Sequence, residues 1–274
     1  MRVASLLLLA APLTVMAGTP DQDAPPPYET SVRSVYDGDT VTLATGDKVR
    51  MAAINTPEIK PLEKYAIEAR EATRAFIEGR SVTLGYGSLF RDSYGRLLAE
   101  VFVDGRSASV NLLEQGLAHV FLIPPTEQDT SPYFAAQERA RLANRGLWSL
   151  EEYQGTLHVT SFHANADGDD RANVNGEYLR VCNISDADVD IRGYSIMDSA
   201  GNRYMFPAMV IPRGNTVKVH SGIGEHQIDP TKQLKIYLDS PTPIWNNDRD
   251  QATIYDRFGE VVDTRLHETK YAER

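Results

Sequence analysis

The strongest constraint on the fold is a change in hydrophobic patterning near residue 150. Before it, short β-rich runs come first and helical spacings follow; after it, strand-like runs alternate with turn clusters to the end of the chain. A chain of 274 residues is long enough for two domains, each burying its own core. We therefore expect a boundary at Glu151–Gly155, between a domain at 29–150 and a domain at 156–266, with a C-terminal tail at 267–274.

The first half contains β-rich runs separated by turns. Asp37-Gly38-Asp39 and Thr45-Gly46-Asp47 supply the first two turns, because Asp-Gly pairs favour tight hairpins. The expected strands are Val32–Val35, Val41–Leu43, Val49–Ile54, Val82–Tyr86 and Leu97–Val103.

Three helices are expected in the same half. A short one should lie near Val110–Gln115, and Ser131 as N-cap with Pro132 at the first position should open another that runs to about Asn144. The first helix should end at Gly79. Its apolar face is predicted by spacings of three and four, at Leu62, Ala66, Ala69, Thr73 and Phe76.

The second half contains turn clusters separated by roughly 10–15 residues, which is close to the spacing of an antiparallel sandwich or barrel. The turn clusters are Asp167-Gly168-Asp169, Asn175-Gly176, Ser199-Ala200-Gly201-Asn202, Pro212-Arg213-Gly214-Asn215, Asn246-Asn247-Asp248 and Phe258-Gly259. We expect Cys182, the chain's single cysteine, to be a small buried apolar residue, and a single cysteine excludes any disulfide within the chain.

The N-terminus has the pattern of a secretory signal peptide. Arg2 precedes an apolar run from Val3 to Met16, and Val15-Met16-Ala17 offers a cleavage site. A membrane anchor is the alternative, but the run is shorter than the ~20 apolar residues of a spanning helix. We expect a signal peptide at 1–17, a Pro-rich linker at 18–28, no transmembrane span in the mature chain, and a secreted or periplasmic protein.

A series of short motifs carries the chemistry of the first half. In chain order these are Asp37-Gly38-Asp39-Thr40, Val49-Arg50, Thr56-Pro57-Glu58, Asp92-Ser93-Tyr94-Gly95-Arg96, Asp104-Gly105 and Gly116-Leu117-Ala118. Each alone has a structural explanation: a turn, a solvated arginine or the start of a helix. Together and in this order, the motifs between Ser31 and Ser149 resemble the staphylococcal nuclease (thermonuclease) family. The resemblance implies an OB-fold five-stranded barrel with three helices.

The resemblance also implies the roles of individual residues in phosphodiester cleavage. Asp39, Asn55 and Thr56 match the positions that hold a calcium ion, Thr56 through its backbone carbonyl. Glu58 matches the carboxylate that activates or orients the attacking water. Arg50 and Arg96 match the two guanidinium groups that bind the phosphate, and Tyr94 an aromatic ring beside the nucleotide.

The sequence departs from the family pattern at three places. Asn55 stands where the family usually has a second metal-binding aspartate, so we expect weaker calcium binding. His119–Pro125 lacks tyrosines that some relatives place near the base, and Ser93 stands where the best-known member has a lysine.

Motifs of the second half resemble the lamin-tail domain, whose fold is an immunoglobulin-like antiparallel β-sandwich. They lie between Leu157 and Thr264 and are Asn175–Leu179 with Asn183, Val189–Tyr194 with Asp198, Trp245–Asp248 with Asp250, and Asp256–Asp263. The partner of this domain is not implied by the motifs. We expect Trp245 to anchor the core.

Two other groups in the second half contain residue types that can bind metal ions. Asn165, Asp167, Asp169 and Asp170 resemble the start of a calcium loop, but a solvated loop is favoured because the glycine and distal glutamate of an EF-hand are missing. The histidines show no ligand spacing and are expected as scattered core or surface residues: His158, His163, His220 and His226.

These observations favour a secreted calcium-dependent nuclease that cleaves DNA or RNA with little sequence specificity and leaves 3′-phosphate ends. The alternatives are an inactive nuclease-fold protein whose second domain binds a protein, envelope or nucleic-acid partner, and a phosphodiesterase acting on another substrate. The net charge of −10 does not exclude nucleic acid, because residues 29–150 carry 14 basic and 16 acidic side chains while residues 151–274 carry 13 and 20. We expect weak binding without metal that depends on Arg50 and Arg96.

Overall fold

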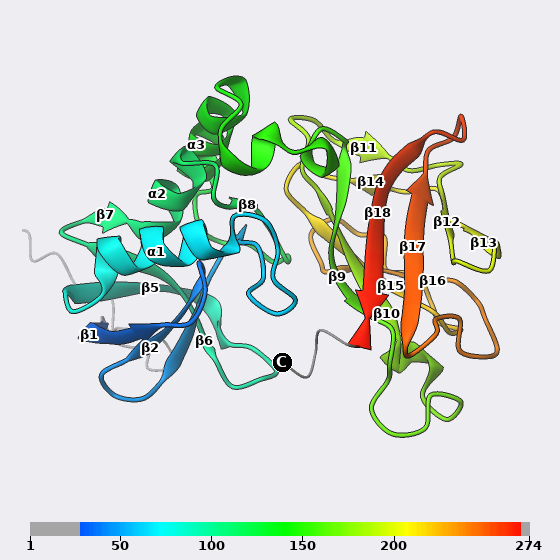
Figure 1. Cartoon of the computed structure of the whole chain (residues 1–274), viewed down its shortest axis with the longest axis horizontal. Coiled ribbons are helices and arrows are strands. Elements are labelled where there is room, and N and C mark those ends of the chain that lie inside the picture. Colours follow the sequence, from blue (N-terminus) through cyan, green and yellow to red (C-terminus); the bar gives the residue numbers. More distant parts are fainter. Residues whose placement is uncertain (1–27, 270–274) are drawn as a thin grey trace, which may run out of the picture.

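The computed structural model describes residues 28–269, which form a β-barrel with helices and a β-sandwich side by side (Figure 1). The proposed signal peptide, the linker up to Pro27 and the last five residues of the C-terminal tail lie outside the described residues. In the described part of the chain, no helix combines the length and the apolar character needed to span a bilayer.

The first half is a closed five-stranded barrel. Neighbouring strands run in the order β3-β2-β1-β5-β6, and a parallel pairing of β3 with β6 closes the ring. The barrel strands are β1 (Tyr28–Val35), β2 (Thr40–Leu43), β3 (Lys48–Met51), β5 (Ser81–Arg91) and β6 (Leu97–Val103). The short β7 (Arg106–Ser107) extends β6. Alternating apolar residues point into the barrel: Val41, Leu43, Val49 and Met51 are all fully buried.

The predicted strand Val49–Ile54 is wrong in its extent, because the chain breaks after Met51. Ala53 adopts a left-handed conformation with φ 63°, which a continuing strand does not allow. The chain then forms a second short strand, β4 (Ile54–Asn55), which pairs with β8 (His119–Val120) away from the barrel sheet.

Three helices cover the barrel as predicted, with different starting points (Figure 1). Their bounds are α1 (Ala66–Ile77), α2 (Ala108–Glu114) and α3 (Ser131–Leu142). The first helix begins after Tyr65, which is left-handed with φ 69°, so Leu62 lies outside it and is 65% exposed. The amide of Ser131 donates to Asp129 Oδ1 at 2.9 Å, so Ser131 belongs to the helix and is not its N-cap.

The second half is a sandwich of two four-stranded sheets. One sheet has the order β16-β15-β10-β9 and the other β13-β12-β17-β18. Their strands are β9 (Leu157–His163), β10 (Tyr178–Asn183), β12 (Ser195–Met197), β13 (Arg203–Met205), β15 (Thr216–His220), β16 (Leu234–Tyr237), β17 (Arg249–Tyr255) and β18 (Val261–Glu268). A further pair joins β11 (Val189–Asp190) to β14 (Val210–Ile211), and a 3-10 turn lies at Val174–Gly176.

The sandwich differs from a purely antiparallel one at a single edge. Strands β15 and β16 run parallel, with Val217 opposite Leu234 and His220 opposite Tyr237. Between the sheets, the core contains Trp245, which is 4% exposed and packs edge-on against Phe162, as expected of an anchor.

A third, small apolar core lies between the two domains. Two 3-10 turns, Gly146–Ser149 and Glu151–Tyr153, lead from α3 into β9. Trp148 and Tyr153 from these turns pack with Cys182 and Ile184 of the sandwich domain, and Cys182 is fully buried as predicted. Backbone hydrogen bonds also cross the boundary, because Leu122 N donates to Gly214 O and Thr216 N to Leu122 O.

Candidate active site

The turn between β1 and β2 places two acidic side chains inside the protein. Asp37 Oδ1 accepts hydrogen bonds from the amides of Asp39 (3.1 Å) and Thr40 (2.6 Å), which holds the turn. Gly38 lies against Thr56: a Cβ at this glycine would be 2.7 Å from Thr56 Cγ2. The Asp-Gly-Asp sequence therefore brings the turn directly against the segment that follows β4.

Asp39 is the centre of the cluster and is 4% exposed. Its Oδ2 accepts from the amide and the hydroxyl of Thr56, at 2.9 and 3.1 Å. Its Oδ1 accepts from Thr40 Oγ1 and lies 3.1 Å from Arg50 Nε. Four donors therefore surround the two carboxylate oxygens of Asp39.

Arg50, on β3, connects Asp39 to Asn55. Besides its ion pair with Asp39, Arg50 donates through Nη2 to Asn55 Oδ1 at 3.1 Å and through Nη1 to Met51 O. Asn55 Nδ2 in turn donates to Thr56 O at 3.3 Å. The structure thus brings together Asp39, Arg50, Asn55 and Thr56, four of the residues that the sequence assigned to one site.

Glu58 lies close to this cluster, with three acidic neighbours that affect its ionisation. Burial, followed by the negative charges of Asp39, Asp37 and Glu63, raises the pKa of Glu58 to about 7, although Arg50 acts in the opposite direction. Burial and Asp39 raise the pKa of Asp37 to about 6 in the same way. Thr56-Pro57-Glu58 does not open a helix, because α1 begins only at Ala66.

Arg96 and Tyr94 lie in the turn between β5 and β6, and within residues 28–269 they form no hydrogen bond or ion pair with the Asp39 cluster. Arg96 Nε donates to Asp92 Oδ2 at 2.7 Å, and its guanidinium lies 5.6 Å from the Tyr94 ring centroid. Arg96 precedes β6, whose Leu98 pairs with Arg50 on β3. The turn is therefore held beside the site rather than inside it.

Glu63 and Arg265 lie beside the candidate site, although no sequence motif indicates either residue. Glu63 Oε2 accepts from the amide of Glu58 at 2.8 Å, and Glu63 Oε1 forms an ion pair with Arg265 of the second domain. The loop that carries the candidate catalytic glutamate is thus tied to β18. No sequence spacing indicates a pair separated by 202 residues.

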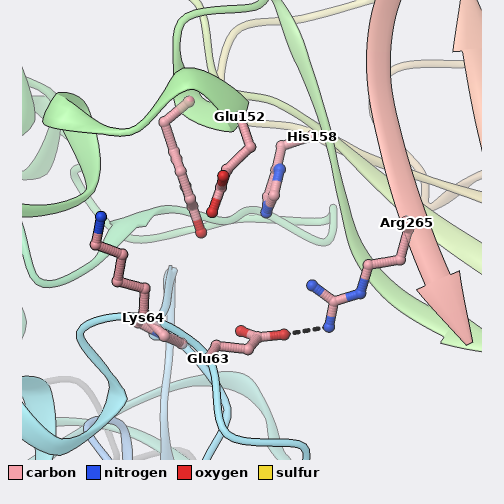
Figure 2. A pocket seen from close by; sticks show the side chains of 7 residues that line it. Glu63, Lys64, Glu152, His158 and Arg265 are labelled. Atoms are coloured by element: carbon pink, nitrogen blue, oxygen red, sulfur yellow. Dashed lines mark hydrogen bonds and ion pairs between the residues drawn. The ribbon is translucent and has the colours of Figure 1, made fainter. Parts of the chain in front are cut away.

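A cavity of about 120 Å³ lies at this junction (Figure 2). Figure 2 shows Glu63 paired with Arg265 on one side and Glu152 and His158 on the other. Tyr153 lines it as well, its ring centroid 4.3 Å from that of His158. The cavity is polar and lies between the domains, next to the loop of Pro57 and Glu58.

The donor set of the cluster suits a hard divalent cation. Asp39 offers a carboxylate, Asn55 an amide oxygen and Thr56 a backbone carbonyl, all ligand types that calcium accepts. Burial and then neighbouring negative charge raise the pKa values of Asp37 and Glu58, and a nearby cation would offset that charge. In residues 28–269 no three His, Cys, Asp or Glu side chains converge in the arrangement of a metal site, so backbone and amide oxygens would have to complete the ligand set.

The acidic loop of the second domain uses its side chains for its own structure. Asp170 Oδ1 accepts from the amide of Ala166, and its Oδ2 from the Asn247 side chain. Asp169 Oδ1 accepts from the Arg171 amide. Asp169 and Asp170 therefore accept hydrogen bonds from the protein itself, whereas the sequence favoured a solvated loop.

Comparison with known proteins identifies both halves. Residues 48–150 match the family described as Staphylococcal nuclease homologue, and residues 151–268 match the Lamin Tail Domain.

Individual relatives are nucleases. The chain is 29% identical over 124 residues to Thermonuclease of Staphylococcus intermedius (43% of this chain, 74% of that protein) and 30% identical over 122 residues to Thermonuclease of Staphylococcus hyicus (42% and 72%). It is 30% identical over 126 residues to Endonuclease YncB of Bacillus subtilis, covering 43% of this chain and 60% of that protein.

Proposed function

Because the chain belongs to the staphylococcal nuclease family and carries a Lamin Tail Domain after the nuclease domain, we propose that it is a calcium-dependent nuclease. Its substrate is DNA or RNA, cleaved with little sequence specificity to leave 3′-phosphate ends. The observation that carries the proposal is the cluster in which Asp39 is bound by Arg50 and Thr56, with Glu58 beside it. The apolar run at 1–17 supports action outside the cytoplasm.

Asp39, Asn55 and Thr56 would hold the calcium ion through oxygen atoms. A bound calcium ion supplies positive charge that offsets the charge of the phosphate oxygens. Asp39 is positioned for this role in advance, because its turn is fixed by Asp37 and its carboxylate is aligned by the Thr56 amide.

Glu58 orients a water molecule toward phosphorus and accepts its proton. A pKa of about 7 suits a group that must gain and lose a proton near neutrality. As the water oxygen bonds to phosphorus, the bond from phosphorus to the 5′ oxygen breaks, and the phosphate stays on the 3′ oxygen of the neighbouring nucleotide.

The two arginines neutralise the phosphate from different elements. Arg50 can present its Nη atoms to a phosphate when its bond to Asn55 opens, while its Nε remains beside Asp39. Arg96 reaches the substrate from the β5–β6 turn, where Asp92 holds it. A guanidinium suits both places, since it donates two parallel hydrogen bonds and stays charged.

The test is cleavage of plasmid and of heat-denatured DNA by the purified protein, with calcium and with a calcium chelator. We expect cleavage with calcium and none with chelator. The product ends should carry a 5′-hydroxyl, which a kinase labels without prior phosphatase treatment, and a 3′-phosphate, which blocks extension by a polymerase until it is removed. Cleavage that the chelator leaves unchanged, or products with 5′-phosphate ends, would contradict the proposal.

One observation favours a second candidate, a binding protein without activity. Asn55 lacks the charge of a carboxylate, and its amide donates to the Thr56 carbonyl that calcium would need. Binding of DNA without cleavage at saturating calcium would support this candidate.

A further inference from the structure

One face of the sandwich domain carries basic side chains in line across three strands. In the sheet β16-β15-β10-β9, residues such as Leu179, Val219 and Ile236 point into the core and are fully buried, so their neighbours point outward. The register places Arg180 opposite Lys218, and Lys218 opposite Lys235. We call Arg180, Lys218 and Lys235 the basic row; at ~4.8 Å between strands it is about 10 Å long.

The basic row has no acidic partner. Within residues 28–269, none of its three side chains forms an ion pair with a carboxylate. Partial burial and the charges of Arg180 and Lys235 lower the pKa of Lys218, so the cations repel one another. These three neighbouring cations lie in the half of the chain that carries 13 basic and 20 acidic residues. An anion on this face would relieve the repulsion.

A row of rings runs beside the basic row. Tyr178 is opposite both His163 and His220, and His220 is opposite Tyr237. The rings of His163 and Tyr178 stack with centroids 4.9 Å apart, and those of His220 and Tyr237 with centroids 5.1 Å apart. We call these four residues the ring row. Its side chains are already ordered by contact with one another, so little rotamer entropy is lost when a ligand stacks on them.

The two rows meet at Tyr178 and continue into the nuclease domain. Lys218 Nζ lies 3.6 Å from the Tyr178 ring centroid. Burial, followed by the nearby Tyr94 hydroxyl of the nuclease domain, raises the pKa of Tyr178. Tyr94 is 74% exposed and lies next to Arg96, to which we assign phosphate binding from beside the Asp39 cluster. A chain leaving the site past Tyr94 would therefore reach this face.

We propose that the basic row and the ring row together bind a single-stranded segment of the nucleic acid that the barrel domain cleaves, and this rests on the proposed function for the identity of the substrate. Phosphates lie on Arg180, Lys218 and Lys235, and bases stack on His163, the exposed member of the ring row, and on Tyr94. A single strand fits because its bases are free to stack, whereas a duplex keeps them inside. Three cations give modest affinity and a log–log salt slope near −2.

The test measures binding of a 5′-labelled 20-mer of deoxythymidine by fluorescence anisotropy, to the full chain, in chelator so that nothing is cleaved, and over a salt series. The variant Lys218→Gln/Lys235→Gln removes two cations at nearly constant volume. Lys232→Gln is the control, because Lys232 is exposed on the same domain and pairs with Asp229 instead. Thermal melting confirms that each variant is folded.

We expect the double variant to bind the 20-mer at least tenfold more weakly with a salt slope reduced by about 1.4, and Lys232→Gln to bind as the wild type does. Unchanged binding by the double variant would overturn the proposal. So would equal wild-type affinity for the 20-mer, an abasic 20-mer and polyglutamate, since the face would then be a general polyanion site.

A separate assay keeps this proposal distinct from the proposed function. Cleavage of a dinucleotide, too short to reach the sandwich domain, is measured for the wild type with calcium. If the dinucleotide and longer DNA are not cleaved but the 20-mer binds through the basic row, the nuclease proposal fails and the binding face stands. If cleavage occurs but the double variant binds normally, only the binding face fails.

Discussion

Arg50 Nη2 donates to Asn55 Oδ1 at 3.1 Å. This bond joins a proposed phosphate-binding group to the residue that departs from the family pattern. Within residues 28–269, an amide at position 55 leaves Arg50 with Asp39 as its one ion-pair partner, and it leaves the proposed cation site with one negative charge fewer. The departure is therefore expected to change calcium affinity more than the arrangement of the site.

We predict that Asn55→Asp lowers the calcium concentration needed for half-maximal cleavage about tenfold or more. Each factor of ten corresponds to about 1.4 kcal/mol of calcium-binding free energy. The added charge acts directly on the cation. Gln115→Glu adds the same charge at an exposed position at the end of α2 and should leave calcium dependence unchanged. A calcium titration of cleavage rates checks both variants, and an identical midpoint for Asn55→Asp and wild type would count against Asn55 as a ligand.

Arg50→Lys should lower kcat/KM about 10²- to 10³-fold. Lysine keeps the charge but has a single nitrogen, so it cannot stay beside Asp39 while also donating two parallel bonds to a phosphate. Arg74→Lys, at an exposed arginine of α1 that pairs with Glu71, is the matched control and should retain activity. Near-normal cleavage by Arg50→Lys would remove Arg50 from the phosphate-binding role.

The ion pair between Glu63 and Arg265 should couple the two domains. Each side chain is 21% exposed, so the pair is partly shielded from solvent. In a double-mutant cycle with Glu63→Gln and Arg265→Gln, urea unfolding should give a coupling energy of about 1 kcal/mol. Arg249 and Glu268, which are 4.0 Å apart on neighbouring strands, provide a comparison pair. Additive effects of Glu63→Gln and Arg265→Gln would show that the pair does not couple the domains.

His119 should make the protein less stable in acid. Its ring is fully buried, and burial, followed by the charges of His158 and Arg50, lowers the pKa of His119 to about 3. Between about pH 6.5 and 3 the unfolded imidazole binds a proton that the folded one does not. The free energy of unfolding therefore falls as pH falls through this window, by up to ~1.4 kcal/mol per pH unit from this group.

His119→Gln should remove this contribution, so its unfolding free energy should decline less between pH 6.5 and pH 4 than that of the wild type. His163→Gln, at an exposed histidine, is the control. The difference between variants is the quantity to measure, because the raised pKa values of Asp37 and Glu58 act with the opposite sign over part of the range. Equal pH slopes for His119→Gln and wild type would contradict the buried neutral state.

Much of the fold could be predicted from local patterns. Alternating apolar residues such as Val41 and Leu43 indicate strands, and turn sequences separate them. The end of β3 could not be predicted, because a left-handed Ala53 has no local signal. Nor could the start of α1, since Leu62 matches the helical spacing but stays in solvent before the left-handed Tyr65.

The candidate site was predictable only where its residues follow one another in motifs. Asp39, Arg50 and Thr56 were assigned by resemblance, and the structure brings them into contact. Glu63 and Arg265 escaped prediction because their contact depends on how the domains pack. The histidines of the second half show no spacing in sequence, yet strand register places His163 and His220 beside Tyr178.

The central claim is that Glu58 acts on the attacking water in a calcium-dependent nuclease. The most direct measurement is the initial rate of cleavage of denatured DNA at saturating calcium. It compares the wild type with Glu58→Gln and Glu68→Gln. Glu68 is an exposed glutamate on α1 and serves as the matched control. We predict that Glu58→Gln cleaves about 10²- to 10⁴-fold more slowly than the wild type, while Glu68→Gln is unaffected. Equal rates for Glu58→Gln and wild type, or no cleavage by the wild type, would contradict the claim.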